Sequence, residues 1–144
     1  MTSIPELDIH LFNEGTHRRL HEVLGAQVGD GGARFAVWAP SAKAVHLVGD
    51  HDGWASQHAL EPNGSSGIWS AWIEGAAVGT TYRYRITTPD GFVLDKSDPV
   101  GAAHHEAPST DSLIPSLDHA WGDGEWMAGR GERNALDAPM SIYE

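Results

Sequence analysis

Residues 81–87, Thr-Tyr-Arg-Tyr-Arg-Ile-Thr, decide the fold class of this 144-residue chain. Tyr82, Tyr84 and Ile86 alternate with Arg83 and Arg85, so one face of the stretch is apolar and the other is charged. A period of two is typical of a β-strand that covers a core with one face and meets water with the other. The stretch therefore predicts a half-buried strand with both tyrosines in the core.

Similar stretches flank this one in both directions. We expect further strands at residues 34–39, 43–48, 68–73 and 92–94, separated by turns rich in glycine, asparagine and proline. Short strands joined by such turns favour antiparallel pairing. The sequence therefore predicts an all-β domain, an antiparallel β-sandwich.

The two ends of the chain have different patterns. At residues 16–24, Leu20, Val23 and Leu24 fall on one face at helical spacing, which predicts a short helix capped by Thr16 and ended by Gly25. Residues 98–144 have no such periodicity, and we expect an extended segment that lies over a surface. Residues 139–144 begin a strand-like run that stops, so the chain looks truncated.

The composition excludes several classes of partner. Twenty acidic against nine basic side chains give a formal net charge of −11. Because nucleic acids and anionic membranes are bound through clustered basic side chains, we expect neither as a partner. The chain has no cysteine, which rules out disulfides and cysteine-ligated zinc. No apolar run resembles a membrane span or signal peptide, so we expect a soluble protein of the cytoplasm.

Residues 45–54, Val-His-Leu-Val-Gly-Asp-His-Asp-Gly-Trp, give the best indication of function. An apolar strand leads into a turn that Asp50, Asp52 and Gly53 favour, and the turn ends in Trp54. A large flat ring at a loop tip is unfavourable in water unless it packs on protein or binds a ligand. The pattern favours a surface for a neutral ligand with a flat apolar face, such as a sugar.

The remaining aromatic side chains and the histidines indicate structure. We expect Trp38, Trp69 and Trp72 in the core or at an interface, with Trp69 and Trp72 on opposite faces of one strand. The pairs His17/His21 and His104/His105 could hold a metal by spacing, but the sequence places no third ligand beside either. Neither a catalytic nucleophile–base arrangement nor a phosphate-binding loop is recognisable. The sequence therefore predicts no catalytic residues, no metal site and no cofactor.

Several blocks of sequence share their order and spacing with one known family. They are residues 8–20, 24–26, 35–40 (Phe-Ala-Val-Trp-Ala-Pro), 48–54, 67–69, 82–86 and 96–99. In this order they resemble the amino-terminal region of bacterial 1,4-α-glucan (glycogen) branching enzymes, which carries a family-48 carbohydrate-binding module. Residues 121–143 resemble the connector to the catalytic barrel. Gln27, His21 and His51 depart from the family, which usually has histidine, an aromatic residue and phenylalanine there.

The resemblance implies a domain organisation. The sandwich would be immunoglobulin-like, with a short N-terminal helix and an extended C-terminal tail. Residues 1–30 would form a lead with the helix, residues 31–115 the carbohydrate-binding module, and residues 116–144 a connector toward a missing catalytic barrel. The carboxylates that transfer glucan chains would lie in that barrel, so this fragment alone would not be an enzyme.

The resemblance also implies a role and a set of contacts. The module would bind α-1,4-glucan, as glycogen or maltooligosaccharide, and position the enzyme on it. Trp54 would stack on a glucose ring and Arg83 would donate hydrogen bonds to hydroxyls. Phe92 stands near the position where related modules have a second stacking tryptophan, and Lys43 and Asn63 are further polar candidates.

Two alternatives to sugar binding remain. In the first, the module is a structural domain that docks on the enzyme's own catalytic barrel and binds little sugar. In the second, the fragment itself releases or transfers glucan chains.

Overall fold

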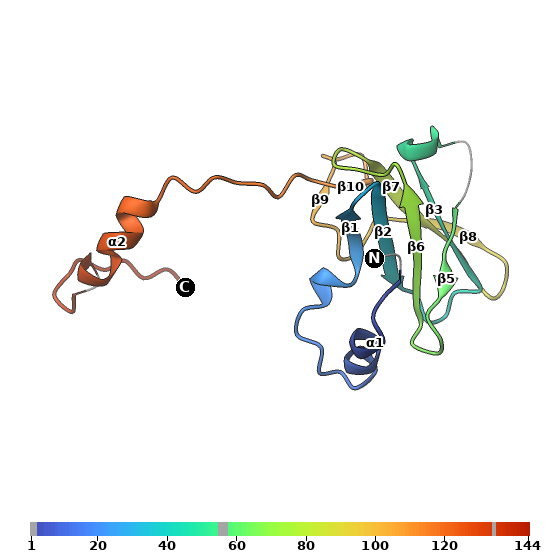
Figure 1. Cartoon of the computed structure of the whole chain (residues 1–144), viewed down its shortest axis with the longest axis horizontal. Helices are drawn as coiled ribbons and strands as arrows, with labels where there is room; N and C mark the ends of the chain where they lie inside the picture. Colours follow the sequence, from blue (N-terminus) through green and yellow to red (C-terminus); the bar gives the residue numbers. More distant parts are fainter. Residues whose placement is uncertain (1–2, 55–57, 134) are drawn as a thin grey trace.

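Two antiparallel sheets pack face to face in the computed structural model, which describes residues 3–54, 58–133 and 135–144 (Figure 1). The first sheet has the order β1 (Gly25–Gly29), β2 (Gly32–Trp38), β6 (Ile68–Glu74), β5 (Glu61–Pro62). The second has the order β4 (His58–Ala59), β3 (Ala44–Gly49), β7 (Thr81–Thr87), β10 (Ser112–Leu113), β9 (Ala103–His104), with β8 (Val93–Lys96) also paired to β7. The predicted all-β sandwich is confirmed, and β7 has the predicted bounds.

The core lies between the two sheets. Phe35 from β2, Leu47 from β3, and Tyr82 and Tyr84 from β7 are each at most 1% exposed. The predicted core position of both tyrosines is therefore confirmed. Their rings meet edge to face, with centroids 5.9 Å apart.

A buried carboxylate satisfies both tyrosine hydroxyls. Tyr82 Oη donates to Asp98 Oδ2 at 2.7 Å and Tyr84 Oη lies 3.2 Å from the same oxygen. Asp98 is 1% exposed, and burial raises the pKa of its carboxyl although the two tyrosines and the Val100 N–H favour the charged form. Burial and the neighbouring carboxylate also raise the pKa of Tyr82. The network ties the segment after β8 to the core.

The outer face of the first sheet is covered by the N-terminal lead, residues 3–24. Ile4, Val23 and Leu24 pack there against Ala36 and Ile68, and helix α1 (Glu6–Asn13) adds Ile9 and Phe12. Both faces of β2 are thus buried, which explains why its sequence, Gly-Ala-Arg-Phe-Ala-Val-Trp, is nearly continuously apolar.

Arg34 fixes the lead to the sheet. Its guanidinium donates to the backbone carbonyls of Ser3, Glu22 and Val23 over 3.2–3.4 Å, and the residue is only 6% exposed. Burial lowers the pKa of this arginine, while the Asp8 carboxylate opposes the shift. A basic side chain on the outer face of a strand therefore has a structural role here.

The helix predicted at residues 16–24 is wrong in position. The structure has α1 at Glu6–Asn13 and only the 3-10 turn η1 (Leu20–Glu22) in the predicted range. Val23 and Leu24 are buried as the pattern indicated, but Arg34 binds the carbonyls that would continue a helix, and Gly25 (φ 81°) begins β1. The spacing of apolar residues alone could not distinguish an α-helix from a 3-10 turn that packs on the sheet.

The tryptophans divide between structure and surface. Trp69 packs against the core, while Trp72 lies near Gly29 and Gly32 on the outer face, so their predicted opposite orientation is confirmed. Of the two positions expected for Trp38, core or interface, the core is excluded, because Trp38 is 54% exposed at the end of β2, with the Phe12 ring 6.1 Å from its own.

The prediction of an extended segment that lies over a surface at residues 98–144 holds only for the first part, because residues 98–115 pack on the second sheet through β9 and β10, whereas the tail, described over residues 116–133 and 135–144, does not. Residues 116–123 are extended, but α2 (Gly124–Arg133) follows and has no buried residue. The tail projects away from the sandwich (Figure 1). None of the helices among the described residues has the length and hydropathy that a membrane crossing requires.

Candidate functional site

Trp54 lies at the tip of a turn that the fold holds at two points. β3 ends at Gly49, η2 (Asp50–Asp52) follows, and Gly53 and Trp54 both have left-handed backbones, with φ of 67° and 62°. Trp54 N–H donates to Gly49 O at 2.8 Å. A bulky residue rarely adopts this conformation, which costs about 1–2 kcal/mol.

Asp50 connects the turn to the neighbouring strand. Its Oδ1 accepts the Thr81 N–H at 2.9 Å, at the start of β7. Trp54 is 45% exposed. A partly exposed ring on a strained turn that is fixed to two strands could receive a flat apolar ligand with little rearrangement.

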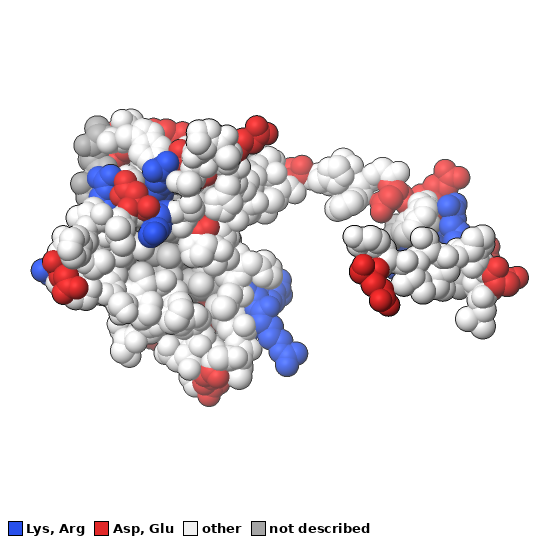
Figure 2. All heavy atoms as spheres, turned by 180° about the vertical axis from the view of Figure 1, so that it is seen from behind, with Lys and Arg blue, Asp and Glu red and all other residues white. Residues whose placement is uncertain are grey.

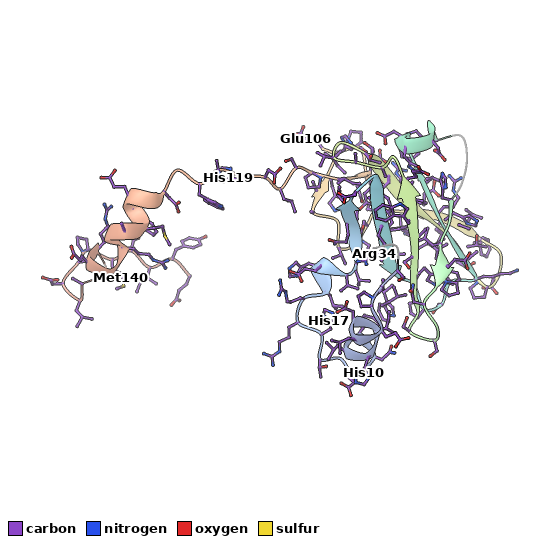
Figure 3. All side chains as sticks on the ribbon, viewed as in Figure 1. His10, His17, Arg34, Glu106, His119 and Met140 are labelled. Carbon is purple, nitrogen blue, oxygen red and sulfur yellow. The ribbon has the colours of Figure 1, made fainter. Side chains whose placement is uncertain are left out.

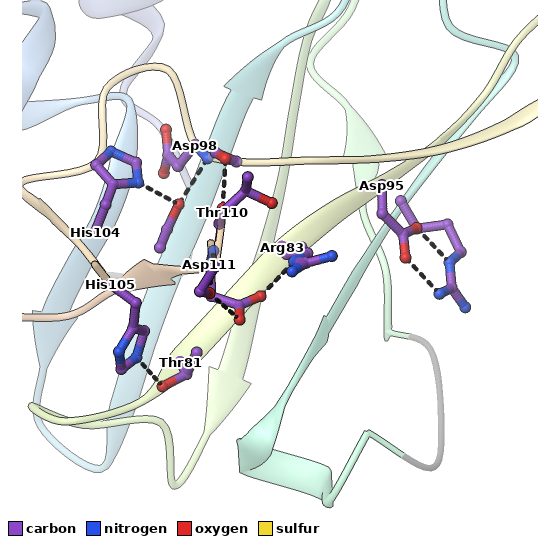
Figure 4. Close-up of polar contacts among 12 residues, drawn as sticks. Thr81, Arg83, Asp95, Asp98, His104, His105, Thr110 and Asp111 are labelled. Carbon is purple, nitrogen blue, oxygen red and sulfur yellow. Dashed lines mark hydrogen bonds and ion pairs between the residues drawn. The ribbon is translucent and has the colours of Figure 1, made fainter. Parts of the chain in front are cut away.

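Arg83 and Arg85 point to the outer face of the second sheet, as their alternation predicted, and each is paired with a carboxylate (Figure 4). Arg83 Nε donates to Asp111 Oδ1. Arg85 binds Asp95 through two bonds of 2.7 Å. Hydrogen bonding between them raises the pKa of Arg85 and lowers that of Asp95.

The Asp111 carboxylate holds Arg83 in one orientation. Burial opposes ionisation of Asp111, but hydrogen bonds from Ser109 and Arg83 outweigh it and lower its pKa. A guanidinium has five N–H donors, and Asp111 takes one of them. Since no other hydrogen bond of this group is formed within residues 3–54, 58–133 and 135–144, its remaining N–H groups can donate to a neutral ligand. On the face seen in Figure 2, basic and acidic side chains lie side by side at one corner of the sandwich, and a separate basic group projects from its lower edge.

The other three predicted site residues lie elsewhere. Lys43 and Phe92 are exposed at the opposite end of β3 and β7, since Lys43 N–H donates to Thr87 O and β8 begins beside Thr87. β3 has six residues, so that end lies about 20 Å from the Trp54 turn. Asn63 belongs to the first sheet, where its Nδ2 donates to Ser70 Oγ at 2.9 Å and approaches the Ile68 carbonyl.

The structure thus brings together only part of the predicted set. Trp54 and Arg83 share one end of the second sheet, because Val48, next to the turn, is paired with Arg83. Asn63 stabilises the β5–β6 turn. A ligand touching both Trp54 and Phe92 would have to span the whole strand.

A cavity of about 660 Å³ lies between the lead and the first sheet, and no sequence pattern predicted it. Trp72 is among its lining residues, together with polar side chains that include Asp8, His17 and Arg34. His17 and Arg34 lie where the lead meets the sheet (Figure 3). An aromatic ring among hydrogen-bonding groups could also receive a sugar. However, Arg34 and His17 already form hydrogen bonds with Ser3 and Asp8 of the N-terminal lead.

Neither histidine pair considered from the sequence forms a metal site. His17 is committed to Asp8 through Nε2 at 3.0 Å and to the Arg19 N–H through Nδ1, and His21 lies outside any α-helix. His104 contacts Ser112 and His105 contacts Thr81, so their rings do not converge (Figure 4).

A different group of metal-ligating side chains meets beside the Trp54 turn. His51, Asp52 and His58 each bring one ligand atom within 4.8 Å of the others. Burial lowers the pKa of the His51 imidazole, with the Asp52 carboxylate opposing. Sequence reasoning missed this group because His58 reaches the turn only through the pairing of β4 with β3.

The chain is similar to known proteins in both sequence and fold. Residues 23–101 match the model of carbohydrate-binding module 48, the isoamylase N-terminal domain. The 1,4-alpha-glucan branching enzyme GlgB of Corynebacterium jeikeium is 47% identical over the whole chain, which covers 20% of that relative. GlgB of Aromatoleum aromaticum is 46% identical over 98% of the chain and 22% of the relative. The chain thus spans about a fifth of the length of these curated relatives.

Solved structures of pullulanases have the same sandwich. Klebsiella pneumoniae pullulanase complexed with maltotriose aligns with a TM-score of 0.55 and 31% identity, over 67% of this chain and 10% of that one. Pullulanase from Bacillus acidopullulyticus aligns with a TM-score of 0.56 and 26% identity, over 65% and 12% of the two chains.

Proposed function

This chain belongs to the carbohydrate-binding module 48 family, and from that membership we propose that its sandwich binds α-1,4-glucan through the Trp54 turn. The chain is also similar throughout its length to the amino-terminal part of GlgB branching enzymes. We therefore propose that it positions such an enzyme on glycogen in the cytoplasm. The chain transfer itself would be performed by parts of the enzyme that this chain does not resemble.

The observation that carries the proposal is the exposure of Trp54, 45% for the whole residue, on a turn held by Gly49 and Thr81. One face of a glucose ring consists of C–H groups, and stacking it on the indole removes apolar area of both partners from water. Such burial contributes about 1.5–3 kcal/mol. Because the turn is already fixed, little conformational entropy is lost when the sugar binds.

Arg83 provides the polar part of the proposed contact. Its guanidinium lies beside the turn end of β3 and is held by Asp111, so its unused N–H groups are presented in one orientation. Sugar hydroxyls accept hydrogen bonds from such donors. The acidic chain, with a net charge of −11, suits a neutral ligand better than an anionic one.

The proposal is tested by titrating the chain with maltoheptaose in a calorimeter. We expect saturable binding that Trp54→Ala weakens by about tenfold or more, the loss of a stacking contact. Trp126→Ala is the matched control, because Trp126 is 46% exposed but lies in α2 of the tail. We expect this control to bind as the unmodified chain does. Equal affinity in both variants would overturn the assignment to Trp54.

A second candidate function, docking on a catalytic domain, is favoured by the apolar side chains of the tail. A segment that stays in water usually exposes few large apolar side chains. The tail exposes Leu117, Trp121, Trp126, Met127, Leu136, Met140, Ile142 and Tyr143. A folded chain that does not bind maltoheptaose at all would favour this function over glucan recognition.

A further inference from the structure

Three side chains that commonly bind transition metals converge at the β3–η2 turn. Asp52 Oδ2 lies 3.9 Å from His51 Nε2 and 3.6 Å from His58 Nε2. The two imidazole rings have centroids 5.0 Å apart and are tilted by 47°. The register of β4 on β3, which pairs His58 with Leu47, places the third group beside the turn.

His51 is the unusual member of this group. Its side chain is only 2% exposed, yet neither ring nitrogen has a hydrogen-bond partner among the described residues. Buried imidazoles nearly always satisfy at least one nitrogen, because leaving both unpaired costs free energy. The nearest opposite charge is the Asp52 carboxylate, at 3.9 Å, which is too long for a hydrogen bond. A buried imidazole nitrogen that lies near two other ligand atoms and is not used in a hydrogen bond to a described residue is available to bind a metal ion.

We propose that His51, Asp52 and His58 bind a divalent transition metal of the zinc class. Imidazole suits zinc and its neighbours and not calcium or magnesium, which prefer oxygen ligands. Two histidines and one carboxylate with a water in the fourth position form a common tetrahedral arrangement. The ion would connect η2 to β4 across the strand end that carries Trp54.

The spacing of the three atoms fits such an ion after a small adjustment. With metal–ligand bonds of about 2.0–2.1 Å, the ligand atoms of a tetrahedral site lie about 3.3 Å apart. The observed atoms lie within 4.8 Å of one another, so they must approach by about 1 Å on average. His58, whose side chain is 43% exposed, has room to rotate toward the other two.

Zinc titration of the whole chain tests the site without reference to glucan. After removal of metal with a chelator, we expect one zinc ion per chain by calorimetry and a rise in the unfolding temperature on adding zinc. His58→Ala should weaken binding by at least about tenfold and remove the temperature rise. Because His58 is on the surface, this variant is expected to fold normally.

Two further variants sharpen the result. His51→Phe removes the buried ligand while filling its space, and it should weaken zinc binding as much as His58→Ala does. His10→Ala is the control, since His10 is an exposed histidine 3.5 Å from Glu14 on α1, and it should leave binding unchanged. Absence of zinc binding to the unmodified chain, or equal binding by His58→Ala and the control, would overturn the site.

Discussion

At the scale of single residues, the proposed glucan site and the proposed metal site each depend on a residue in an unusual environment. Trp54 has a left-handed backbone that bulky residues avoid, and the buried His51 ring has no hydrogen-bond partner within the part of the chain that the structure describes. Such exceptions persist only where the surrounding structure imposes them. Two hydrogen bonds hold the Trp54 turn in place: the Thr81 N–H donates to Asp50 Oδ1, and the Trp54 N–H donates to the Gly49 carbonyl.

Asp98 gives a prediction about pH. Burial raises the pKa of its carboxyl in the folded chain above the ordinary value of 3.8. At pH values between the pKa of the unfolded chain and that of the folded chain, the folded chain holds a proton that the unfolded chain has lost. Stability therefore falls as the pH rises through that window. Asp98→Asn has no such proton. We expect the free energy of unfolding of the natural chain to decline relative to that of the variant as the pH rises from about 3.8.

Urea denaturation of both proteins, at a series of pH values from 4 to 7, measures this difference directly. The comparison cancels the contributions of Asp95 and Asp111, whose lowered pKa values act in the opposite direction in both proteins. A difference that stays constant, or that grows in favour of the natural chain with rising pH, would contradict the burial account of Asp98.

At the scale of elements, the sequence predicted the long strands well, because β2, β3, β6 and β7 each show period-two or continuously apolar patterns. The two-residue strands β9 and β10 have no pattern of their own and exist only through their partners. β1 was also missed, although its signal was present. Asp30-Gly31 is a two-residue hairpin loop between the paired Gly29 and Gly32.

The candidate site could be predicted only in part, for a related reason. Trp54 and Arg83 were found from local turn chemistry and strand alternation, and strand pairing does bring them to the same sheet end. The sequence around Lys43, Phe92 and Asn63 does not show where these residues lie relative to Trp54. Their location depends on which sheet each strand joins and on the direction in which it runs. His58 required a register that no local pattern contains.

Arg34 tests how the N-terminal lead is held. Arg34→Met keeps the apolar stem but leaves the carbonyls of Ser3, Glu22 and Val23 without their donor. We expect a loss of about 2–4 kcal/mol in the free energy of unfolding, together with faster hydrogen exchange of the α1 amides.

Arg85→Ala serves as the control for Arg34, because the Arg85–Asp95 pair is about one-third exposed and such pairs contribute about 0–1 kcal/mol. If Arg34→Met were no less stable than Arg85→Ala, the lead would have to be held by its apolar contacts alone.

At the scale of the whole molecule, the burial pattern predicts that the tail adds little to the stability of the sandwich. No residue of α2 is buried, whereas Ile114, just before the tail, is 3% exposed. We expect a chain shortened to residues 1–116 to unfold with a free energy within about 0.5 kcal/mol of the full chain. The shortened chain should also self-associate less in sedimentation experiments, because the exposed apolar side chains are removed. A decrease in the free energy of unfolding well above about 0.5 kcal/mol would mean that the tail stabilises the sandwich.

The most direct test of glucan binding at the Trp54 turn is an NMR titration of the indole N–H signals with maltoheptaose. The chain has six tryptophans, and they report on separate places: Trp54 on the turn, Trp72 on the cavity, Trp38 and Trp69 on the first sheet, and Trp121 and Trp126 on the tail. Our account predicts that the Trp54 signal shifts saturably while the other five stay in place. A shift confined to Trp72 or to the tail tryptophans, or no shift in the folded chain, would contradict it.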